Sequence, residues 1–337
     1  MKNWIGKNGP FLIAEIGGNH EGDFEYAKNL TALACNSGVD AVKFQIYTGD
    51  TIVSKVEDPD RNKHFKKFEL SKDEYISLAK MCQDEGVIFT SSVWDLQSLS
   101  WIDEFIPVYK VGSGDLTAYP ILKEIAKTSK PVILSTGLSE LEEVNKSIEF
   151  LRSANEIYYD YNHLAVLQCT SMYPIELGDS HLSVMKTYKD KFNVAVGYSD
   201  HTVGANAVEI AYSLGAEIIE MHFTDQREGK EFRDHKVSFT REEIKAFIER
   251  IKEIDLIKGD SIKRPLKIEE DAGHLQSFRR AVYPSKDLKA GTILTEENLT
   301  VLRPNKGIDA RDFYKLIGKR IKKDLKESEA LYWDIIE

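Results

Sequence analysis

The chain has 337 residues, of which 42% are hydrophobic and 30% are charged, and its formal net charge is −10. These values describe an ordinary globular protein with room for one large domain and a smaller one, and they argue against a general nucleic-acid binder. Cys35, Cys82 and Cys169 have neither metal-type nor disulfide-type spacing and are predicted to be buried thiols. The N-terminus lacks a signal-like apolar region, and no apolar run approaches the ~18 residues of a membrane helix. We therefore expect a cytoplasmic protein.

Short apolar runs of strand character alternate with segments of helical periodicity. We predict strands at residues 11–17, 40–46, 86–92, 107–113, 131–137, 163–169, 193–199 and 216–223. Intervening helices stop at Gly38, Gly86 and Gly215, as expected of helix C-caps. This alternation predicts parallel strands with right-handed crossovers, and eight units over about 255 residues match the α/β architecture of a (β/α)8 TIM barrel. A doubly wound open sheet is the alternative, which the regular count of eight disfavours.

The strand–helix rhythm ends near residue 258. A polar stretch follows, and then short segments with turn signals such as 289-KAGT-292. We predict three parts: a catalytic barrel at residues 1–258, a linker at 259–276 and a small separate domain at 277–337. The basic run 63-KHFKK-67 is predicted to be a solvated loop, with a flap over the barrel mouth as the alternative.

Polar residues end every predicted strand, at the barrel face that carries the functional site. They include two lysines, Lys43 and Lys110, and a series of small hydroxyls. Lysines supply point charge and hydroxyls supply directed hydrogen bonds, so the set predicts an anion pocket suited to a phosphorylated substrate. Both lysines lie within apolar strands, where an unpaired charge is costly, and this disfavours the alternative that they merely snorkel to the rim.

Two histidines, His201 and His222, end the seventh and eighth strands, and neighbouring strands lie about 4.8 Å apart. They can share one divalent ion that keeps positions open for water and substrate, or each can be a structural histidine. The stretch 197-GYSDHTVG-204 also suggests a hydrolase triad, but it lacks the G-x-S-x-G turn. Asp200 within it either orients His201 or caps the next helix.

Eight motifs in fixed order resemble the sialic acid synthase family. They are 11-FLIAEIGGNHEGD-23, 40-DAVKFQIYT-48, 109-YKVGSGD-115, 131-PVILSTG-137, 168-QCTSMYP-174, 197-GYSDHT-202, 220-EMHFTD-225 and 233-RDHKVS-238. The tail, from 277-SFRRAVYPSKDLKAGTIL-294 to 316-LIGKRIKKDL-325, resembles the antifreeze-like (SAF) domain that follows the barrel in that family. The resemblance covers nearly the whole chain, and several motifs together are far more specific than one.

The resemblance implies an enzyme that condenses phosphoenolpyruvate with an N-acylated hexose and water. The products are a nonulosonic acid and phosphate, released by metal-assisted C–O cleavage. By resemblance, phosphoenolpyruvate is held by Lys43, Ser91, Lys110, Ser113, Ser135, Ser171 and Ser199. The sugar site is implied to comprise Glu21, Gln45, Asp115, Tyr173 and Arg303.

The implied metal ligands are His201 and His222, which would hold Mn²⁺ or another divalent cation such as Mg²⁺ or Co²⁺. The catalytic set is Glu21, Lys43, Lys110, His201 and His222, with Glu21 a candidate for proton transfer or sugar-hydroxyl binding. Arg303 would reach the N-acyl group from the neighbouring subunit, which implies a domain-swapped homodimer.

Departures from the family pattern concern the sugar. Asp115 stands where some members have Glu, Ser171 where some have Asn, and the loop with Asp234 and His235 differs from the usual form. The sequence therefore indicates the reaction class more firmly than the identity of the sugar substrate. N-acetylneuraminate is the slightly favoured product, with legionaminate and pseudaminate as alternatives. More distant alternatives are a 3-deoxy sugar-acid phosphate synthase, which would lack the tail domain, and a carbohydrate- or ice-binding protein on an inactive barrel.

Overall fold

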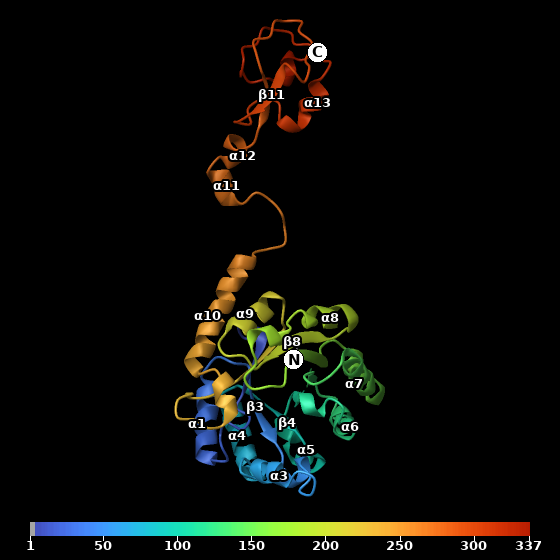
Figure 1. The fold of residues 1–337 in the computed structure, drawn as a ribbon, viewed down its shortest axis with the longest axis vertical. Helices are drawn as coiled ribbons and strands as arrows, with labels where there is room; N and C mark the ends of the chain where they lie inside the picture. Colours follow the sequence, from blue (N-terminus) through green and yellow to red (C-terminus); the bar gives the residue numbers. More distant parts are fainter. Residues whose placement is uncertain (1–3) are drawn as a thin grey trace. The chain divides into compact units, whose positions relative to one another are not determined.

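The structure, a computed structural model, describes residues 4–337 and divides into two compact units, one running to Gly259 and the other from Asp260 to Glu337. In the first unit, parallel strands alternate with helices that lie around their outside (Figure 1). The strands are β2 (Gly9–Glu15), β3 (Ala41–Ile46), β4 (Ile88–Val93), β5 (Tyr109–Val111), β6 (Val132–Ser135), β7 (Leu164–Cys169), β8 (Ala195–Asp200) and β9 (Ile218–His222). The helices are α1 (Phe24–Cys35), α2 (Gly49–Ile52), α3 (Pro59–Lys66), α4 (Lys72–Asp84), α5 (Leu96–Ile102), α6 (Tyr119–Lys127), α7 (Leu141–Ala154), α8 (Val184–Lys191), α9 (Asn206–Ser213) and α10 (Arg241–Lys258).

The strands follow one another around a barrel in the order β4-β3-β2-β9-β8-β7-β6-β5. The seam between β4 and β5 is bridged by the Thr90 hydroxyl, which donates to the carbonyl of Val108 at 2.7 Å. All eight predicted strands are present within the described residues, and the (β/α)8 barrel is confirmed.

Strand side chains alternate between the barrel interior and the surrounding helices. The barrel interior toward the amino-terminal ends of the strands is apolar and includes Phe11, Ile13, Ala41, Val108 and Ile218. The buried Trp4 belongs to the same cluster, and its indole N–H donates to the carbonyl of Tyr161 at 3.0 Å. The short strand β1 (Ile5–Gly6), which the sequence patterns do not reveal, pairs antiparallel with the start of β2. The polar ends of the strands therefore stand on a packed apolar base.

Helix boundaries follow from local chemistry. Gly38 (φ +99°) and Gly86 (φ +65°) adopt left-handed conformations just after α1 and α4, which confirms their predicted role as helix terminators. The predicted loop at 63–67 is wrong, because α3 covers most of it. The Asp58 carboxylate accepts from the Arg61 N–H at 3.1 Å and Pro59 occupies the first helical position, a start signal that the basic composition obscures.

The second unit has its own hydrophobic core, which includes Val282, Leu294, Leu299, Ile308 and Leu331. Strands β10 (Ala281–Pro284) and β11 (Leu299–Leu302) pair antiparallel, and the short helix α13 (Phe313–Leu316) follows them. All of the predicted linker except Gly259 falls inside this unit; α11 (Lys267–Asp271) forms within it and α12 (His274–Ser277) at its end. Over residues 4–337, no helix is both long and apolar enough to span a membrane.

Candidate active site

The strand register decides which polar side chains share the barrel interior. Glu15 is paired with Lys43, Lys43 with Thr90, and Gln45 with Ser92. Side chains at paired positions point to the same face of a sheet, so these residues form one inward-facing layer. They lie above the apolar base at the carboxyl ends of the strands, where barrel enzymes place their active sites.

The two predicted lysines are both buried and both paired within this layer. Lys43 Nζ lies 2.6 Å from Glu15 Oε2, and Gln45 donates to the other oxygen of that carboxylate at 2.8 Å. Lys110 Nζ donates to Ser135 Oγ at 2.6 Å and lies 3.4 Å from Glu220 Oε1. The structure thus brings together predicted residues from three strands, and adds two glutamates that the site prediction omits.

These four charged groups, two lysines and two glutamates, sum to zero net charge. Burial alone would lower the pKa of Lys43, but the Glu15 carboxylate raises it above its usual value. Burial lowers the pKa of Lys110 despite the nearby charge of Glu220. A multiply charged anion therefore needs more positive charge than this cluster alone supplies, which a divalent cation could provide.

Serine hydroxyls line the side of the site formed by β5, β6 and β7. The N–H of Gly137 donates to Ser113 Oγ at 3.0 Å. A Cβ atom added at Gly137 would lie 2.2 Å from Ser171 Oγ and 2.9 Å from Ser113 Oγ, so both hydroxyls crowd this glycine. Ser199 completes the set by donating to Glu220 Oε1 at 3.0 Å. Of these four predicted serines, Ser135 contacts Lys110 directly and Ser199 contacts its partner Glu220, while Ser113 and Ser171 meet at Gly137.

Ser91 is the exception, and the structure corrects its placement. It is paired with Phe44, whose ring packs against Tyr75 of α4 at a centroid distance of 6.2 Å, so this register position faces the helices. The Ser91 hydroxyl donates to the carbonyl of Phe44 at 2.9 Å. Its neighbour Ser92 faces the interior, and its Oγ would lie 3.8 Å from a Cβ atom added at Gly112. Ser92 therefore replaces Ser91 as the candidate ligand from β4.

The two predicted metal ligands lie side by side, with ring centroids 5.3 Å apart. His201 Nδ1 lies 2.6 Å from the Thr170 carbonyl, which can only accept, so its Nε2 keeps a free lone pair. His222 Nδ1 is buried without a hydrogen-bond partner in the described chain, and Asp234 Oδ2 lies 3.9 Å away. Burial lowers the pKa of His222 and favours the neutral imidazole that metals bind.

A divalent ion fits this pair, because each ring carries a nitrogen that can coordinate. Within residues 4–337 no cluster of three or more His, Cys, Asp or Glu side chains is arranged to bind a metal. The remaining coordination positions would then belong to water or substrate, as in a catalytic site. Asp200 is not the partner of His201 Nδ1: it accepts from the N–H of Thr202 and the hydroxyl of Tyr198, both at 3.0 Å. It does not cap the next helix either, because α9 begins at Asn206 and its N-cap is Ala205; Asp200 instead closes a local turn with Thr202.

The predicted sugar residues of the barrel lie around this centre. The ring of Tyr173 is 4.0 Å from that of His201 and 5.4 Å from that of His222. Burial raises the pKa of Asp115 to about 6. Its Oδ2 would lie 3.8 Å from a Cβ atom added at Gly112, on the same side of the site as Ser92. Glu21 is partly exposed and lies 3.3 Å from His235 Nε2.

Arg303 lies in the second unit, where its guanidinium packs over the ring of Phe278 at 5.5 Å. Its predicted contact with the sugar requires another subunit and stays a prediction.

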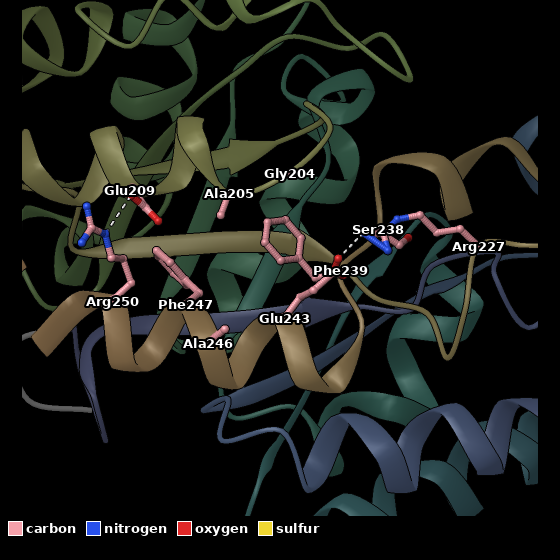
Figure 2. Close-up of a pocket in the computed structure, with 10 residues that line it drawn as sticks. All are labelled: Gly204, Ala205, Glu209, Arg227, Ser238, Phe239, Glu243, Ala246, Phe247 and Arg250. Carbon is pink, nitrogen blue, oxygen red and sulfur yellow. Dashed lines mark hydrogen bonds and ion pairs between the residues drawn. The ribbon is translucent and has the colours of Figure 1, made fainter. Parts of the chain in front are cut away.

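A separate cavity of about 290 Å³ lies between α9 and α10 (Figure 2). Phe239 and Phe247 line it, and Arg250 is paired with Glu209 at 3.1 Å. The other arginine, Arg227, is paired with Glu243. Since both arginines are paired and none of the predicted site residues lines it, this cavity is not the candidate active site.

Several residues of the site are absent from the predicted set: Glu15, Ser92, Cys169, Glu220 and His235. Glu15 and Glu220 do end predicted strands, and they are recognisable as site residues only once their lysine partners are known. Cys169 is a buried free thiol, as predicted, and its Sγ lies 3.9 Å from His201 Nδ1. None of these roles has a signal in sequence spacing alone.

Fold and site together define a TIM-barrel enzyme with a charged, hydroxyl-rich centre beside two imidazoles. Residues 30–263 match the NeuB family and residues 279–337 match the SAF domain, so the chain belongs to the NeuB family. The predicted resemblance to sialic acid synthases is thereby confirmed.

Curated relatives match over almost their full length. The chain is 34% identical to the N,N'-diacetyllegionaminic acid synthase of Legionella pneumophila, over 97% of this chain and 94% of the relative. It is 34% identical to a pseudaminic acid synthase of Campylobacter jejuni, over 95% of each chain. It is 29% identical to the human N-acetylneuraminate-9-phosphate synthase, over 99% of this chain and 95% of the relative.

Solved structures agree. The N-acetylneuraminic acid synthetase of Leptospira borgpetersenii superposes with a TM-score of 0.72 at 28% identity, over 80% of this chain and 92% of that one. The putative spore coat polysaccharide biosynthesis protein E of Chromobacterium violaceum gives a TM-score of 0.79 over 97% and 99% of the two chains. Because the identity to the Chromobacterium protein is only 23%, this second similarity supports the fold alone.

Proposed function

We propose that this protein is a nonulosonic acid synthase that condenses phosphoenolpyruvate with an N-acylated hexose and water, releasing phosphate by C–O cleavage. The observation that carries the proposal is the buried pairing of Lys43 and Lys110 with glutamates, among serine hydroxyls and beside two imidazoles. Membership of the NeuB family and relatives that make three different nonulosonic acids support the same reaction class. We place the reaction in the cytoplasm, where phosphoenolpyruvate is made.

In this proposal, Lys110 and the serines at or just after the ends of β5 to β8 (Ser113, Ser135, Ser171 and Ser199) hold the phosphate, and Lys43 and Ser92 hold the rest of phosphoenolpyruvate. C3 of phosphoenolpyruvate attacks the aldehyde carbon of the open-chain sugar, and the electron pair of the C=O bond moves to its oxygen. Water then adds at C2, and the C–O bond to phosphate breaks. Lysines and hydroxyls fixed before the reaction stabilise the phosphate oxygens throughout without reorganising.

A divalent ion, which we propose to be Mn²⁺, Mg²⁺ or Co²⁺, would be held by His201 and His222. When bound, it supplies Lewis-acid polarisation of the aldehyde and positive charge that offsets the substrate anion.

Two acceptor classes fit the relatives. The 34% identities belong to synthases of legionaminic and pseudaminic acids, against 29% for the human neuraminate-9-phosphate enzyme. We therefore place the 2,4-diacetamido-2,4,6-trideoxyhexoses ahead of N-acetylmannosamine as acceptors. The test is phosphate release with phosphoenolpyruvate, Mn²⁺ and each sugar in turn, with the product identified by mass. No turnover with any of these sugars would overturn the proposed specificity.

The register of β4 gives a matched pair of variants. Ser92→Ala removes an inward hydroxyl and is expected to raise the KM for phosphoenolpyruvate, at a cost of about 1 kcal/mol or roughly fivefold for one hydrogen bond. Ser91→Ala removes a hydroxyl bonded to a backbone carbonyl on the outer face and should leave that KM unchanged. Steady-state kinetics of the two variants decide between the positions, and the reverse result would restore Ser91 to the site.

The second unit supplies Arg303, which we propose binds the N-acyl group of the sugar in a partner's barrel within a domain-swapped homodimer. Arg303→Ala is expected to raise the KM for the sugar about tenfold, the loss of one charge-assisted hydrogen bond, and to leave phosphoenolpyruvate binding unchanged. Calorimetric titration with each substrate measures both. Loss of phosphoenolpyruvate affinity with normal sugar affinity would contradict this placement, and a monomer at assay concentration would contradict the dimer.

A further inference from the structure

A buried histidine outside the predicted site, His235, makes contact with the catalytic candidate Glu21. It is 1% exposed, in the short 3-10 turn between β9 and α10. One ring nitrogen, Nδ1, lies 2.7 Å from Thr224 Oγ1, and the other, Nε2, lies 3.3 Å from Glu21 Oε1. The histidine thus connects a fully buried hydroxyl to a carboxylate that is partly exposed at the barrel mouth.

The partners of Thr224 determine which nitrogen of His235 carries the proton. The Thr224 hydroxyl has a single hydrogen, which it donates to the carbonyl of Gln226 at 2.9 Å. The carboxylate of Asp225, at 3.3 Å, is a second acceptor for the same hydrogen. With its hydrogen directed there, Thr224 Oγ1 can only accept from His235. The network therefore assigns the Nδ1–H tautomer to His235.

This tautomer leaves a lone pair on His235 Nε2, facing the Glu21 carboxylate. Two acceptors face each other, and consistently Nε2 has no well-aligned hydrogen-bond partner among residues 4–337. Burial lowers the pKa of His235, although the charge of Glu21 acts in the opposite direction. A neutral imidazole is thus held ready to accept a hydrogen bond from Glu21 once that side chain has gained a proton.

The backbone also holds Glu21 in place. Its φ of +55° lies in the left-handed region, which a non-glycine residue adopts at an energetic cost and often at functional positions. The Glu21 N–H donates to the Gly18 carbonyl at 2.9 Å, and the Phe232 ring packs so closely on Gly18 that a Cβ atom there would lie 2.7 Å from it. The segment that carries His235 thus packs on the turn that carries Glu21.

We propose that His235 is a positioning residue for Glu21, fixed by Thr224 in the Nδ1–H tautomer so that its Nε2 stabilises the protonated form of Glu21. The inference rests on the proposed function for the identity of the proton source. Glu21 takes a proton from the water that adds at C2: the water O–H bond breaks, its electron pair stays on oxygen, and the new O–H of Glu21 donates to Nε2. His235 keeps its own Nδ1 proton throughout.

Other charged and titratable groups face this pair. Lys230 and Asp225 act on His235, and Tyr26, on α1, donates to Asp225 at 2.6 Å. Lys230 Nζ lies 3.5 Å from Asp225, so these two charges largely offset each other. After burial, the charge of Glu21 is the largest influence on the pKa of His235.

The first test needs no turnover. Nitrogen-15 NMR of the histidine-labelled full-length protein, with His235 assigned by its loss in His235→Asn, is expected to show the Nδ1–H tautomer. Glu21→Gln places an amide donor beside Nε2 and is expected to shift that resonance, whereas Thr224→Val removes the acceptor for Nδ1–H and should move the tautomer toward Nε2–H. The proposal is overturned if the unaltered protein shows the Nε2–H tautomer, or if the chemical shift of His235 Nε2 does not change in Glu21→Gln.

The second test separates positioning from a merely structural role. His235→Asn keeps a group near Thr224 but cannot reach Glu21, so kcat is expected to fall about tenfold to a hundredfold with an unchanged KM for phosphoenolpyruvate. His235→Gln can still reach Glu21 and should recover most of this loss. In a Glu21→Gln background, His235→Asn should cost little more, because the two residues act as one unit.

Additive losses in that cycle would contradict the assignment, as would equal kcat values for the Asn and Gln variants. The matched control is His163→Asn, which removes a histidine whose Nδ1 lies 3.1 Å from Asp160 outside the site and should leave kcat unchanged. If the unaltered protein shows no sugar-dependent phosphate release, the proposed function fails, while the NMR result still decides the His235 tautomer.

Discussion

Replacing Lys110 by methionine is expected to lower kcat/KM for phosphoenolpyruvate about a thousandfold, the upper range for loss of one preorganised donor in a catalytic site. Lys110 Nζ lies 2.6 Å from Ser135 Oγ and 3.4 Å from Glu220 Oε1, so it sits between the hydroxyls and the buried carboxylate. Without it, Glu220 faces the substrate phosphate uncompensated, and repulsion adds to the lost attraction. Phosphate release at varied phosphoenolpyruvate concentrations measures the effect.

The variant also leaves a buried charge unpaired, which costs about 3–5 kcal/mol and could unfold the chain. The double variant Lys110→Met with Glu220→Gln removes both charges and should recover thermal stability without recovering activity. Lys127→Met is the matched control, because Lys127 is exposed and pairs with Glu124 at the surface. A folded Lys110→Met protein with near-normal kcat/KM would contradict the placement of phosphoenolpyruvate.

Removal of divalent metal is expected to lower kcat at least about a hundredfold, since metal polarisation is worth several kcal/mol. It should also weaken phosphoenolpyruvate binding, because Lys43 and Lys110 are already balanced by Glu15 and Glu220. Dialysis against EDTA, followed by activity and calorimetric titration before and after Mn²⁺ is restored, measures both effects.

The variant His222→Ala tests whether His222 is one of the residues that hold the metal. The variant is expected to bind less metal by mass spectrometry and to recover less activity on Mn²⁺ addition than the unaltered protein. His163→Ala, a histidine outside the site, is the control. Phosphate release that persists unchanged after EDTA treatment would rule out a metal requirement.

The barrel was predictable because its signals are local: each buried parallel strand is a short apolar run, and glycines such as Gly86 end the helices between them. The direction in which each strand side chain points was less predictable. A shift of one residue moves a strand side chain to the other face, so neighbouring serines such as Ser91 and Ser92 cannot be separated without the register. The conformation of α3 was missed because its Asp-Pro start was outweighed by the basic composition around it.

The site was predictable in its residue types but not in its charge balance. Lys43 and Lys110 stand out because lysine is rare in apolar strands, yet their partners Glu15 and Glu220 are 28 and 110 residues away in the chain. His235 could not be assigned at all, because its role depends on the hydrogen that Thr224 gives to the backbone of Gln226. Such relations arise from tertiary packing and leave no spacing in the sequence.

In the proposed reaction, phosphoenolpyruvate reacts with a sugar aldehyde and loses phosphate by C–O cleavage. The most direct measurement uses phosphoenolpyruvate labelled with oxygen-18 in the oxygen that bridges carbon and phosphorus, incubated with Mn²⁺ and a diacetamido-trideoxyhexose. We expect sugar-dependent release of phosphate that retains the label, together with a nonulosonic acid that lacks it. Unlabelled phosphate, or phosphate released at the same rate without sugar, would contradict the account.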